Sequence, residues 1–248
     1  MEIAVVVASY KRPGCLRRCL ASLAIQRRPA DEVIVVGQGD DEETVRVYGR
    51  FAGKRWRYLH IPEVSIAAAE NEGVAAATAD VVAFIDDDAE AGTAWLQRLH
   101  VWYREEEVGG VGGTYVEHEG ETPVIAAAAE VGVYKWFGRY VSRQWCFTPG
   151  PRYVDVLSGS NMSFRRELIP PLPSALRPYW HAFEVFICGA VRKQGYRIVF
   201  DPRAYVKHFR GSGPRRYTFA YRSEEDLRRR LYRDNAHNFI FSSLYHDL

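Results

Sequence analysis

Short apolar runs alternate with segments of helical spacing along the first third of the chain, and this alternation limits the fold more than any other feature. Each run is long enough for a strand and too short for a buried helix. The apolar runs are residues 3–8, 32–36, 56–61 and 81–85, and the helical segments are residues 16–23, 42–51 and 66–77. Strands that alternate with helices predict an α/β fold with a mainly parallel sheet and right-handed crossovers.

Acidic residues follow the fourth apolar run directly. Ligands of such sheets bind at the carboxyl ends of the strands, so the loops after the first, second and fourth runs are the places to look for functional residues. The fourth run leads into Asp86, Asp87 and Asp88. Adjacent carboxylates repel one another unless a cation or hydrogen-bond donors neutralise them. The triplet therefore indicates a site for Mg²⁺ or Mn²⁺, although a solvated turn or a helix N-cap accounts for it equally well.

The second half of the chain has a less regular pattern. Residues 118–153 are irregular and aromatic-rich, which is typical of a packed insertion or a lid. The remaining patterns predict helices at residues 91–107 and 181–193, strands at residues 110–117, 197–200 and 205–208, and a helical tail from Glu224 onward.

The composition is that of a globular protein. The 248 residues are 47% hydrophobic and 13% aromatic, which suffices for one large domain with a short appendage. Lys and Arg number 33 against 31 Asp and Glu, and this net charge of +2 argues against a protein that coats nucleic acid without specificity.

No apolar run reaches the roughly 18 residues of a membrane span. An acid stands where a signal peptide needs basic residues, so we expect a cytoplasmic protein.

The four cysteines are too few and too scattered for a disulfide framework. Cys15 and Cys19 lie one helical turn apart, but no second Cys or His pair completes a metal site. We therefore expect buried thiols.

Six short motifs occur in order along residues 1–210. They are Ser9-Tyr10-Lys11-Arg12, Gly37-Gln38-Gly39-Asp40, Asn71 ahead of Gly73, VVAFIDDD, the segment from Gly159 to Arg166, and the segment from Gly195 to Pro202. Each motif alone is weak, whereas the ordered set resembles the inverting family 2 glycosyltransferases of GT-A fold. The resemblance implies a Rossmann-related sheet flanked by helices, with a nucleotide-sugar-binding half at residues 1–117 and an acceptor-binding half at residues 118–210.

The resemblance also implies roles for individual residues. Asp86 would contact the ribose, and Asp88 would hold the Mn²⁺ or Mg²⁺ that bridges the donor diphosphate. His208 matches a position near the metal, although a lone histidine is more often structural. The other donor-binding positions are Ser9, Tyr10, Arg12, Gln38, Asn71 and Asp87, and the acceptor-binding positions are Gly159, Ser160, Asn161 and Trp180.

Inversion at the anomeric carbon needs a base on the acceptor side. Counted back from Gly195, Glu184 falls where the resemblance places the catalytic carboxylate. The flanking Phe183, Val185 and Phe186 predict partial desolvation, which would raise the pKa of this carboxylate toward the range of a base. A surface Glu on an amphipathic helix is the alternative.

Four positions depart from the family's pattern. Phe183 and Phe186 each replace an acid, Gln38 stands in a loop that usually carries acids, and Glu70 stands where the family often has an Arg. A Gln side chain can both donate and accept hydrogen bonds, so it could still recognise a nucleobase. Lys11 or Arg12 could compensate for the contact that is lost at position 70, although either could be a solvated charge.

A basic segment follows the proposed metal-site histidine. Residues 207–233 carry nine Lys or Arg against three acids, a local charge of +6. The tail at residues 211–248 could close over the donor diphosphate, because Arg binds phosphate oxygens well. It could also lie on an anionic membrane surface and so reach a lipid-linked acceptor, or it could be an ordinary solvated helix.

These features predict a metal-dependent inverting glycosyltransferase. It would move a sugar from a nucleoside diphosphate sugar to a hydroxyl of a glycan or lipid-linked saccharide, without a nucleic-acid partner. A nucleotide-sugar-binding protein without turnover is the alternative. A sugar nucleotidyltransferase is less favoured, because the Ser9–Arg12 segment lacks the glycines of a triphosphate loop, and a dinucleotide-dependent oxidoreductase fails for the same reason. The sugar, nucleobase and acceptor remain open.

Overall fold

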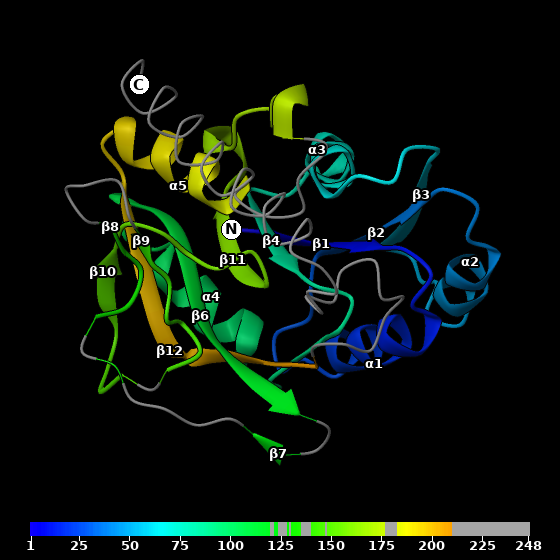
Figure 1. Ribbon diagram of the computed structural model, residues 1–248, viewed down its shortest axis with the longest axis horizontal. Coiled ribbons are helices and arrows are strands. Elements are labelled where there is room, and N and C mark those ends of the chain that lie inside the picture. Colours follow the sequence, from blue (N-terminus) through cyan, green and yellow to red (C-terminus); the bar gives the residue numbers. More distant parts are fainter. Residues whose placement is uncertain are drawn as a thin grey trace, which may run out of the picture.

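Four parallel strands form one half of the central sheet, as the alternating pattern predicts (Figure 1). The computed structural model describes residues 1–119, 122–123, 128, 130–134, 140–146, 148–176 and 183–209. The first elements are β1 (Ile3–Ser9), α1 (Pro13–Ala24), β2 (Glu32–Gln38), α2 (Glu42–Gly49), β3 (Trp56–Ile61), α3 (Ile66–Ala76) and β4 (Val81–Ile85). The strand order in this half is β4, β1, β2, β3.

The second half of the chain extends the same sheet. Its elements are β5 (Ala89–Ala91), α4 (Trp95–Trp102), β6 (Val108–Glu119), β7 (Thr122–Pro123), β8 (Val133–Tyr134), β9 (Tyr140–Val141), β10 (Arg152–Val154), β11 (Asn161–Arg165), α5 (Phe183–Lys193) and β12 (Arg197–His208), with 3₁₀ turns η1 (Arg166–Leu168) and η2 (Ser174–Leu176). Strand β11 lies antiparallel between β4 and β6, and β6 pairs in parallel with β12. The result is a mixed sheet in which β11 joins the two halves.

Helices cover both faces of the sheet, and alternate residues of each strand face different helices. Ala4, Val6 and Ala8 of β1 belong to the apolar cluster that contains α3 and α5. Val5 and Val7 belong to the opposite cluster, which contains α1, α2 and α4. In Figure 1, α3 and α5 lie above the sheet, while α1 and α4 lie below it. The continuous apolar character of residues 3–8 follows from this burial on both faces.

The structure changes two of the predicted elements. Helix α4 begins at Trp95 because Ala89–Ala91 forms β5, which pairs with the end of β12. The two strands predicted at residues 197–200 and 205–208 are one strand, β12, with a shift in register between Asp201 and Val206. Such a register shift interrupts the alternation of buried and exposed residues along a strand. In the sequence, one interrupted strand therefore looks like two separate strands.

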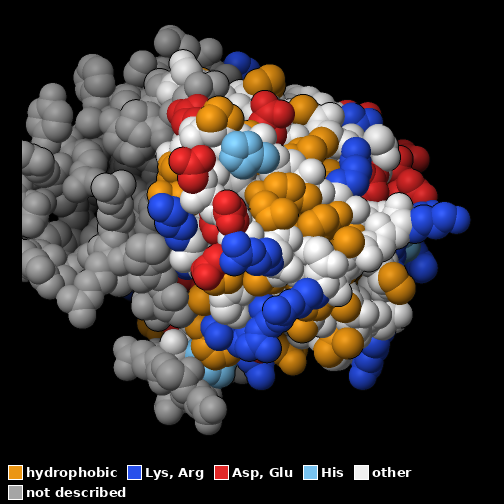
Figure 2. Space-filling model, turned by 90° about the vertical axis from the view of Figure 1, so that its right-hand side faces the viewer, with side chains coloured by type: hydrophobic (Ala, Val, Ile, Leu, Met, Phe, Trp, Pro, Cys, Tyr) orange, Lys and Arg blue, Asp and Glu red, His pale blue; other side chains and the backbone are white. Residues whose placement is uncertain are grey.

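The predictions for the cysteines, the C-terminal tail and membrane-spanning helices can be compared with the structure in turn. The four cysteines are buried thiols, as expected. The helical tail predicted from Glu224 lies outside the described residues. Within the described part of the chain, no helix is long and apolar enough to cross a membrane. Figure 2 shows the face at the α2 and β3 end of the sheet, where basic, acidic and apolar side chains are mixed rather than of one sign.

Candidate functional site

The three aspartates after β4 lie in different environments at the carboxyl edge of the parallel strands. Asp87 is fully buried, and its Oδ2 accepts a hydrogen bond of 2.8 Å from Ser9 Oγ at the end of β1. The side chain of Asp86 is 37% exposed and that of Asp88 is 8% exposed. The buried Asp87 therefore anchors the loop, and Asp86 is the most exposed of the three carboxylates.

Arg12 closes one side of the aspartate cluster. It precedes Pro13, the first residue of α1, where proline is tolerated because the first helical N–H has no partner. Its Nη1 donates to Asp88 Oδ2 at 2.7 Å, and its Nη2 lies 2.7 Å from Asp87 Oδ1. The guanidinium thus offsets the repulsion between two adjacent carboxylates.

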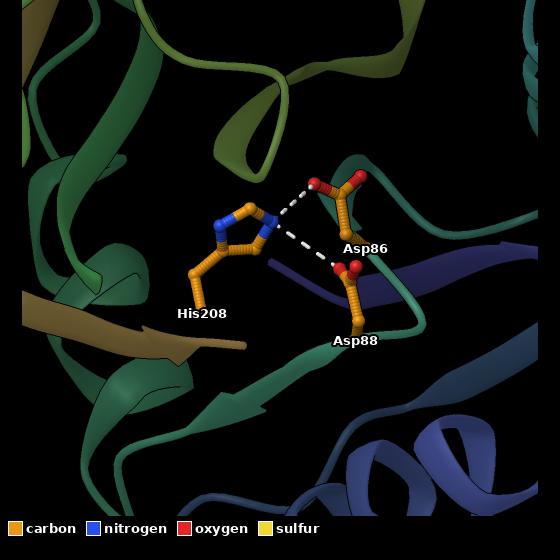
Figure 3. A group of neighbouring side chains, drawn as sticks. All are labelled: Asp86, Asp88 and His208. Carbon is orange, nitrogen blue, oxygen red and sulfur yellow. Dashed lines mark ion pairs between the residues drawn. The ribbon is translucent and has the colours of Figure 1, made fainter. Parts of the chain in front are cut away.

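The imidazole ring of His208 faces the carboxylates of Asp86 and Asp88 (Figure 3). It is the last residue of β12 and pairs with Ala89 of β5, so the short strand that follows the aspartates positions it. Its Nε2 lies 3.3 Å from Asp86 Oδ2 and 3.2 Å from Asp88 Oδ1. Its Nδ1 is buried and has no hydrogen-bond partner among the described residues.

The close packing of these groups shifts their pKa values. Burial raises the pKa of Asp87 to about 7, which Arg12 and Ser9 only partly oppose. Burial by itself lowers the pKa of His208, but hydrogen bonds to Asp86 and Asp88 outweigh it and raise this pKa to about 10. Burial by itself raises the pKa of Asp88, but His208 and Arg12 outweigh it and lower this pKa. His208 is therefore an imidazolium between two carboxylates.

This arrangement fits a divalent cation. One ligand atom from each of Asp86, Asp88 and His208 lies within 4.8 Å of the others. A cation at this point would release the proton of His208 and use Nε2 as a ligand, as happens when metals bind histidine. Two carboxylate oxygens and one imidazole nitrogen suit Mn²⁺ better than Mg²⁺, which prefers oxygen ligands.

Two residues predicted to bind the donor have partners inside the protein. Gln38 is 5% exposed, and its Oε1 accepts a hydrogen bond of 2.8 Å from Ser65 N, so its carbonyl holds the start of α3. Asn71 exchanges two hydrogen bonds with the backbone of Leu172, at 2.9 and 2.8 Å. The structure thus places the side chain of Asn71 against the loop after η1.

Tyr10 lies in the loop after β1, two residues before Arg12. The Lys11 ammonium lies 5.3 Å from the centroid of the Tyr10 ring. Lys11 has a φ of 52°, a left-handed conformation that is costly for a residue other than glycine. The backbone N–H of Lys11 donates to Asp41 Oδ2, which holds the loop in this conformation.

The acceptor-side loop packs against the start of α5. A Cβ added at Gly159 would lie 2.9 Å from the Phe183 ring, so only glycine allows this approach. Ser160 is buried, and its hydroxyl lies 3.1 Å from that of Ser158. Glu184 follows Phe183 in the first turn of α5 and is partly buried. Gly159 and Phe183, the neighbour of Glu184, are thus brought together, while Trp180 lies outside the described residues.

Asn161 has a structural environment that the motif does not indicate. It is fully buried at the start of β11, and its Oδ1 accepts a hydrogen bond of 2.8 Å from Trp95 Nε1. Its Nδ2 donates to the carbonyls of Thr114 at 3.0 Å and Ala204 at 2.8 Å. This amide therefore holds α4, β6 and β12 together beneath the acceptor-side loop.

Sequence reasoning missed the role of Asp41. It is buried and caps α2, with Oδ1 accepting from Thr44 N at 3.2 Å and Oδ2 from Thr44 Oγ1 at 2.6 Å. An Asp followed three residues later by Thr, just before a helical pattern, is an N-cap signal that could have identified it. Through Lys11, the same carboxylate shapes the loop that carries Arg12.

Comparison with known proteins places this site in context. The model of glycosyl transferase family 2 matches residues 4–170. A glucosyl-dolichyl phosphate glucuronosyltransferase of Haloferax volcanii is 26% identical to this chain. The aligned region covers 91% of this chain and 72% of the relative's length. A pre-mycofactocin glycosyltransferase of Mycobacterium tuberculosis is 30% identical to this chain, over 84% of this chain and 42% of the relative's length.

Solved structures share the fold at low sequence identity. GalNAc-T7, crystallised with UDP, GalNAc and Mn²⁺, has a TM-score of 0.69 and 15% identity over 84% of this chain. S. aureus TarS 1–349 in complex with UDP has a TM-score of 0.64 and 16% identity. The chain spans 44% of the GalNAc-T7 chain and 60% of the TarS chain. The sheet and its flanking helices are those of a GT-A fold, and the chain belongs to glycosyl transferase family 2.

Proposed function

We propose that this chain is a metal-dependent, inverting glycosyltransferase that uses a nucleoside diphosphate sugar. The observation that carries the proposal is the convergence of Asp86, Asp88 and His208 at the carboxyl edge of the sheet. Negative charge develops on the nucleoside diphosphate as it leaves the sugar, and a bound divalent cation would neutralise this charge. Asp88 and His208 would hold the cation, with Asp86 beside them toward the ribose.

Other residues of the protein would bind the phosphate groups and accept the proton of the acceptor hydroxyl. Arg12 lies within reach of the same edge and carries the positive charge that phosphate oxygens need. Glu184 would accept the proton of the acceptor hydroxyl, because it lies in the first turn of α5 directly after Phe183, whose ring contacts the acceptor-side loop at Gly159. Ser160 would line that loop, and Asn161 would hold it in place from below.

The acceptor in this proposal is a saccharide or a lipid-linked saccharide. The name of the Haloferax volcanii relative contains a dolichyl phosphate, which favours the lipid-linked class. The protein would act in the cytoplasm, and its basic tail, which lies outside the described residues, would contact either the donor diphosphate or an anionic membrane.

One observation favours a second candidate function. Phe183 stands where the resemblance expects an acid, and its ring packs against Gly159 rather than offering a polar group. A nucleotide-sugar-binding protein without turnover would tolerate this change, whereas a transferase must work with Glu184 alone.

The test is a pair of variants assayed for binding and for turnover. Calorimetry against a panel of nucleoside diphosphates with Mn²⁺ would identify the nucleotide, and hydrolysis of the matching nucleotide sugars would measure turnover. Asp88→Ala should abolish metal-dependent binding. Glu184→Gln should bind normally and lose roughly 10²–10⁴-fold in turnover, the usual contribution of a general base.

The controls separate the two candidate functions. Glu167→Gln changes an exposed acid outside the site and should leave both readouts unchanged. Equal turnover of Glu184→Gln and wild type would exclude Glu184 as the base. Nucleotide binding by the wild type without any hydrolysis or transfer would favour the binding protein.

A further inference from the structure

The ring of His208 is not held in the way that is usual for a histidine that binds a metal. Such a histidine donates its second ring N–H to a carboxylate or a carbonyl, and this hydrogen bond sets the orientation of the ring. The Nδ1 of His208 is buried and has no hydrogen-bond partner among the described residues. Tyr115 packs edge-on against the imidazole, with 5.9 Å between the two ring centroids. The position of His208 therefore depends on packing and on the backbone at the end of β12.

Phe209, the next residue, continues the pairing of β12 with β5. His208 lies opposite Ala89 in this pair. The backbone N–H of Phe209 then donates to the carbonyl of Asp88 at 3.0 Å. The residue that follows one proposed ligand is thus bonded to the backbone of another, so a movement of Phe209 would separate His208 from Asp88.

The ring of Phe209 contacts side chains from two other elements. The Arg18 guanidinium, on α1, lies 5.2 Å from the centroid of this ring. The His118 ring, near the end of β6, has its centroid 5.0 Å away at an interplanar angle of 33°. Arg18 is itself held in place, because its Nε lies 3.0 Å from Glu90 Oε1 of β5. The partly buried ring of Phe209 therefore connects the end of β12 to α1, β5 and β6.

We propose that Phe209 is a positioning residue for the cation site. Its ring contacts keep the end of β12 against β5, so that Nε2 of His208 stays beside Asp86 and Asp88. The end of a strand frays readily where few side-chain contacts hold it. The inference rests on the proposed function and adds a residue that acts on the site through His208.

Titration of the chain with Mn²⁺ alone, without nucleotide, tests this role. Electron paramagnetic resonance of the free ion would measure the Kd for Mn²⁺. Phe209→Ala should weaken binding about tenfold, the lower end of the effect of removing an outer-shell partner of a metal ligand. Phe209→Tyr keeps the ring and its contact with the Arg18 cation, so it should bind within about threefold of wild type.

A second readout reports on His208 directly. The nitrogen of a coordinated imidazole modulates the electron spin echo of Mn²⁺, and His208→Ala supplies the reference spectrum without this modulation. We expect the modulation in wild type and in Phe209→Tyr, and a weaker one in Phe209→Ala at a Mn²⁺ concentration that saturates the site. A residue that only stabilises the fold would leave this signal unchanged.

Tyr153→Ala is the matched control. Tyr153 is an exposed aromatic residue of β10 whose ring also contacts an arginine, with the Arg197 guanidinium 4.7 Å from its centroid. Removal of this ring should change neither the Kd for Mn²⁺ nor the nitrogen modulation. Thermal melting of each variant, measured first, sets an assay temperature at which all of them are folded.

The outcomes distinguish the inference from the function on which it rests. If wild type binds no Mn²⁺, the metal dependence in the proposed function fails, and this inference falls with it. If wild type binds Mn²⁺ without nitrogen modulation, His208 is not a ligand, and the inference is overturned while the metal dependence stands. If Phe209→Ala keeps either the wild-type Kd or the wild-type modulation, only the inference is overturned. Equal losses in Phe209→Ala and Phe209→Tyr would also overturn it, because the ring contacts would then not be what holds His208.

Discussion

Glu32 shows how a single carboxylate connects several segments of this fold. It begins β2, is 9% exposed, and its Oε1 accepts from Thr78 N at 3.0 Å and from Thr78 Oγ1 at 2.5 Å. Its Oε2 accepts from Arg57 of β3, which also donates to the Ala76 carbonyl at 2.6 Å. One residue thus links β2, β3 and the end of α3 at the edge of the sheet away from the site.

This network predicts a dependence of stability on pH. Burial by itself raises the pKa of Glu32, but hydrogen bonds from Thr78 and Arg57 outweigh it and lower this pKa from 4.5. As the pH falls below about 4.5, the unfolded chain takes up a proton before the native state does, so the free energy of unfolding decreases. Glu32→Gln should be less stable than wild type by about 1 kcal/mol at pH 7, and the difference should shrink toward pH 3.

Urea titrations from pH 7 to pH 3 would measure this difference. Glu43→Gln, an exposed acid on α2, is the control and should follow the wild-type curve. If the difference in free energy of unfolding between Glu32→Gln and wild type stays constant over this pH range, the charge of Glu32 does not contribute to stability.

At the scale of elements, two helical glycines have opposite surroundings. Gly73 allows α3 to lie on β1, because an added Cβ would be 2.4 Å from Val6 Cγ1. Gly14, near the start of α1, has nothing within 4 Å of the corresponding position. The first glycine is required by packing, whereas the second only lowers the helix propensity of its segment.

Alanine at each position should therefore have an effect of opposite sign. Gly73→Ala should destabilise the protein by about 1–2 kcal/mol, because overpacking outweighs the gain in helix propensity. Gly14→Ala should stabilise it by about 0.5 kcal/mol, since it reduces the entropy of the unfolded chain. Denaturant unfolding of the two variants measures both changes, and equal effects would contradict this assignment of contacts.

At the scale of the whole molecule, the candidate site draws on distant parts of the chain. Asp86 and Asp88 follow β4, Arg12 precedes α1 and His208 ends β12. A ligand that contacts all of these at once binds only the folded state and so stabilises the entire domain.

The proposed function therefore predicts a conditional thermal shift. With Mn²⁺ and the preferred nucleoside diphosphate at 100 times its Kd, stabilisation should be about 2.7 kcal/mol, or about 5–10 °C. Scanning calorimetry would measure this shift, which should disappear with EDTA and in Asp88→Ala. An undiminished shift in Asp88→Ala would contradict the assignment of Asp88 to the cation.

The sequence alone determined the order of elements in the first half and the edge of the sheet at which the acidic cluster lies. Strand and helix periodicities are local properties, so residues 56–61 and 81–85 could be predicted to their ends. The acids after β4 were also visible, because parallel strands bring their carboxyl ends to one edge. The resemblance to family 2 added the positions of His208 and Glu184.

Only the tertiary structure decided which polar residues have partners inside the protein and which face the site. Asn161 and Asn71 stand in motifs as prominent as that of Asp88, yet their amides bond to Trp95 and Leu172. Glu70 lies in a plain Ala-rich helix, and its burial depends on the packing of α3 over β1. Burial and hydrogen-bond partners arise from contacts between residues far apart in the chain, and local patterns do not encode such contacts.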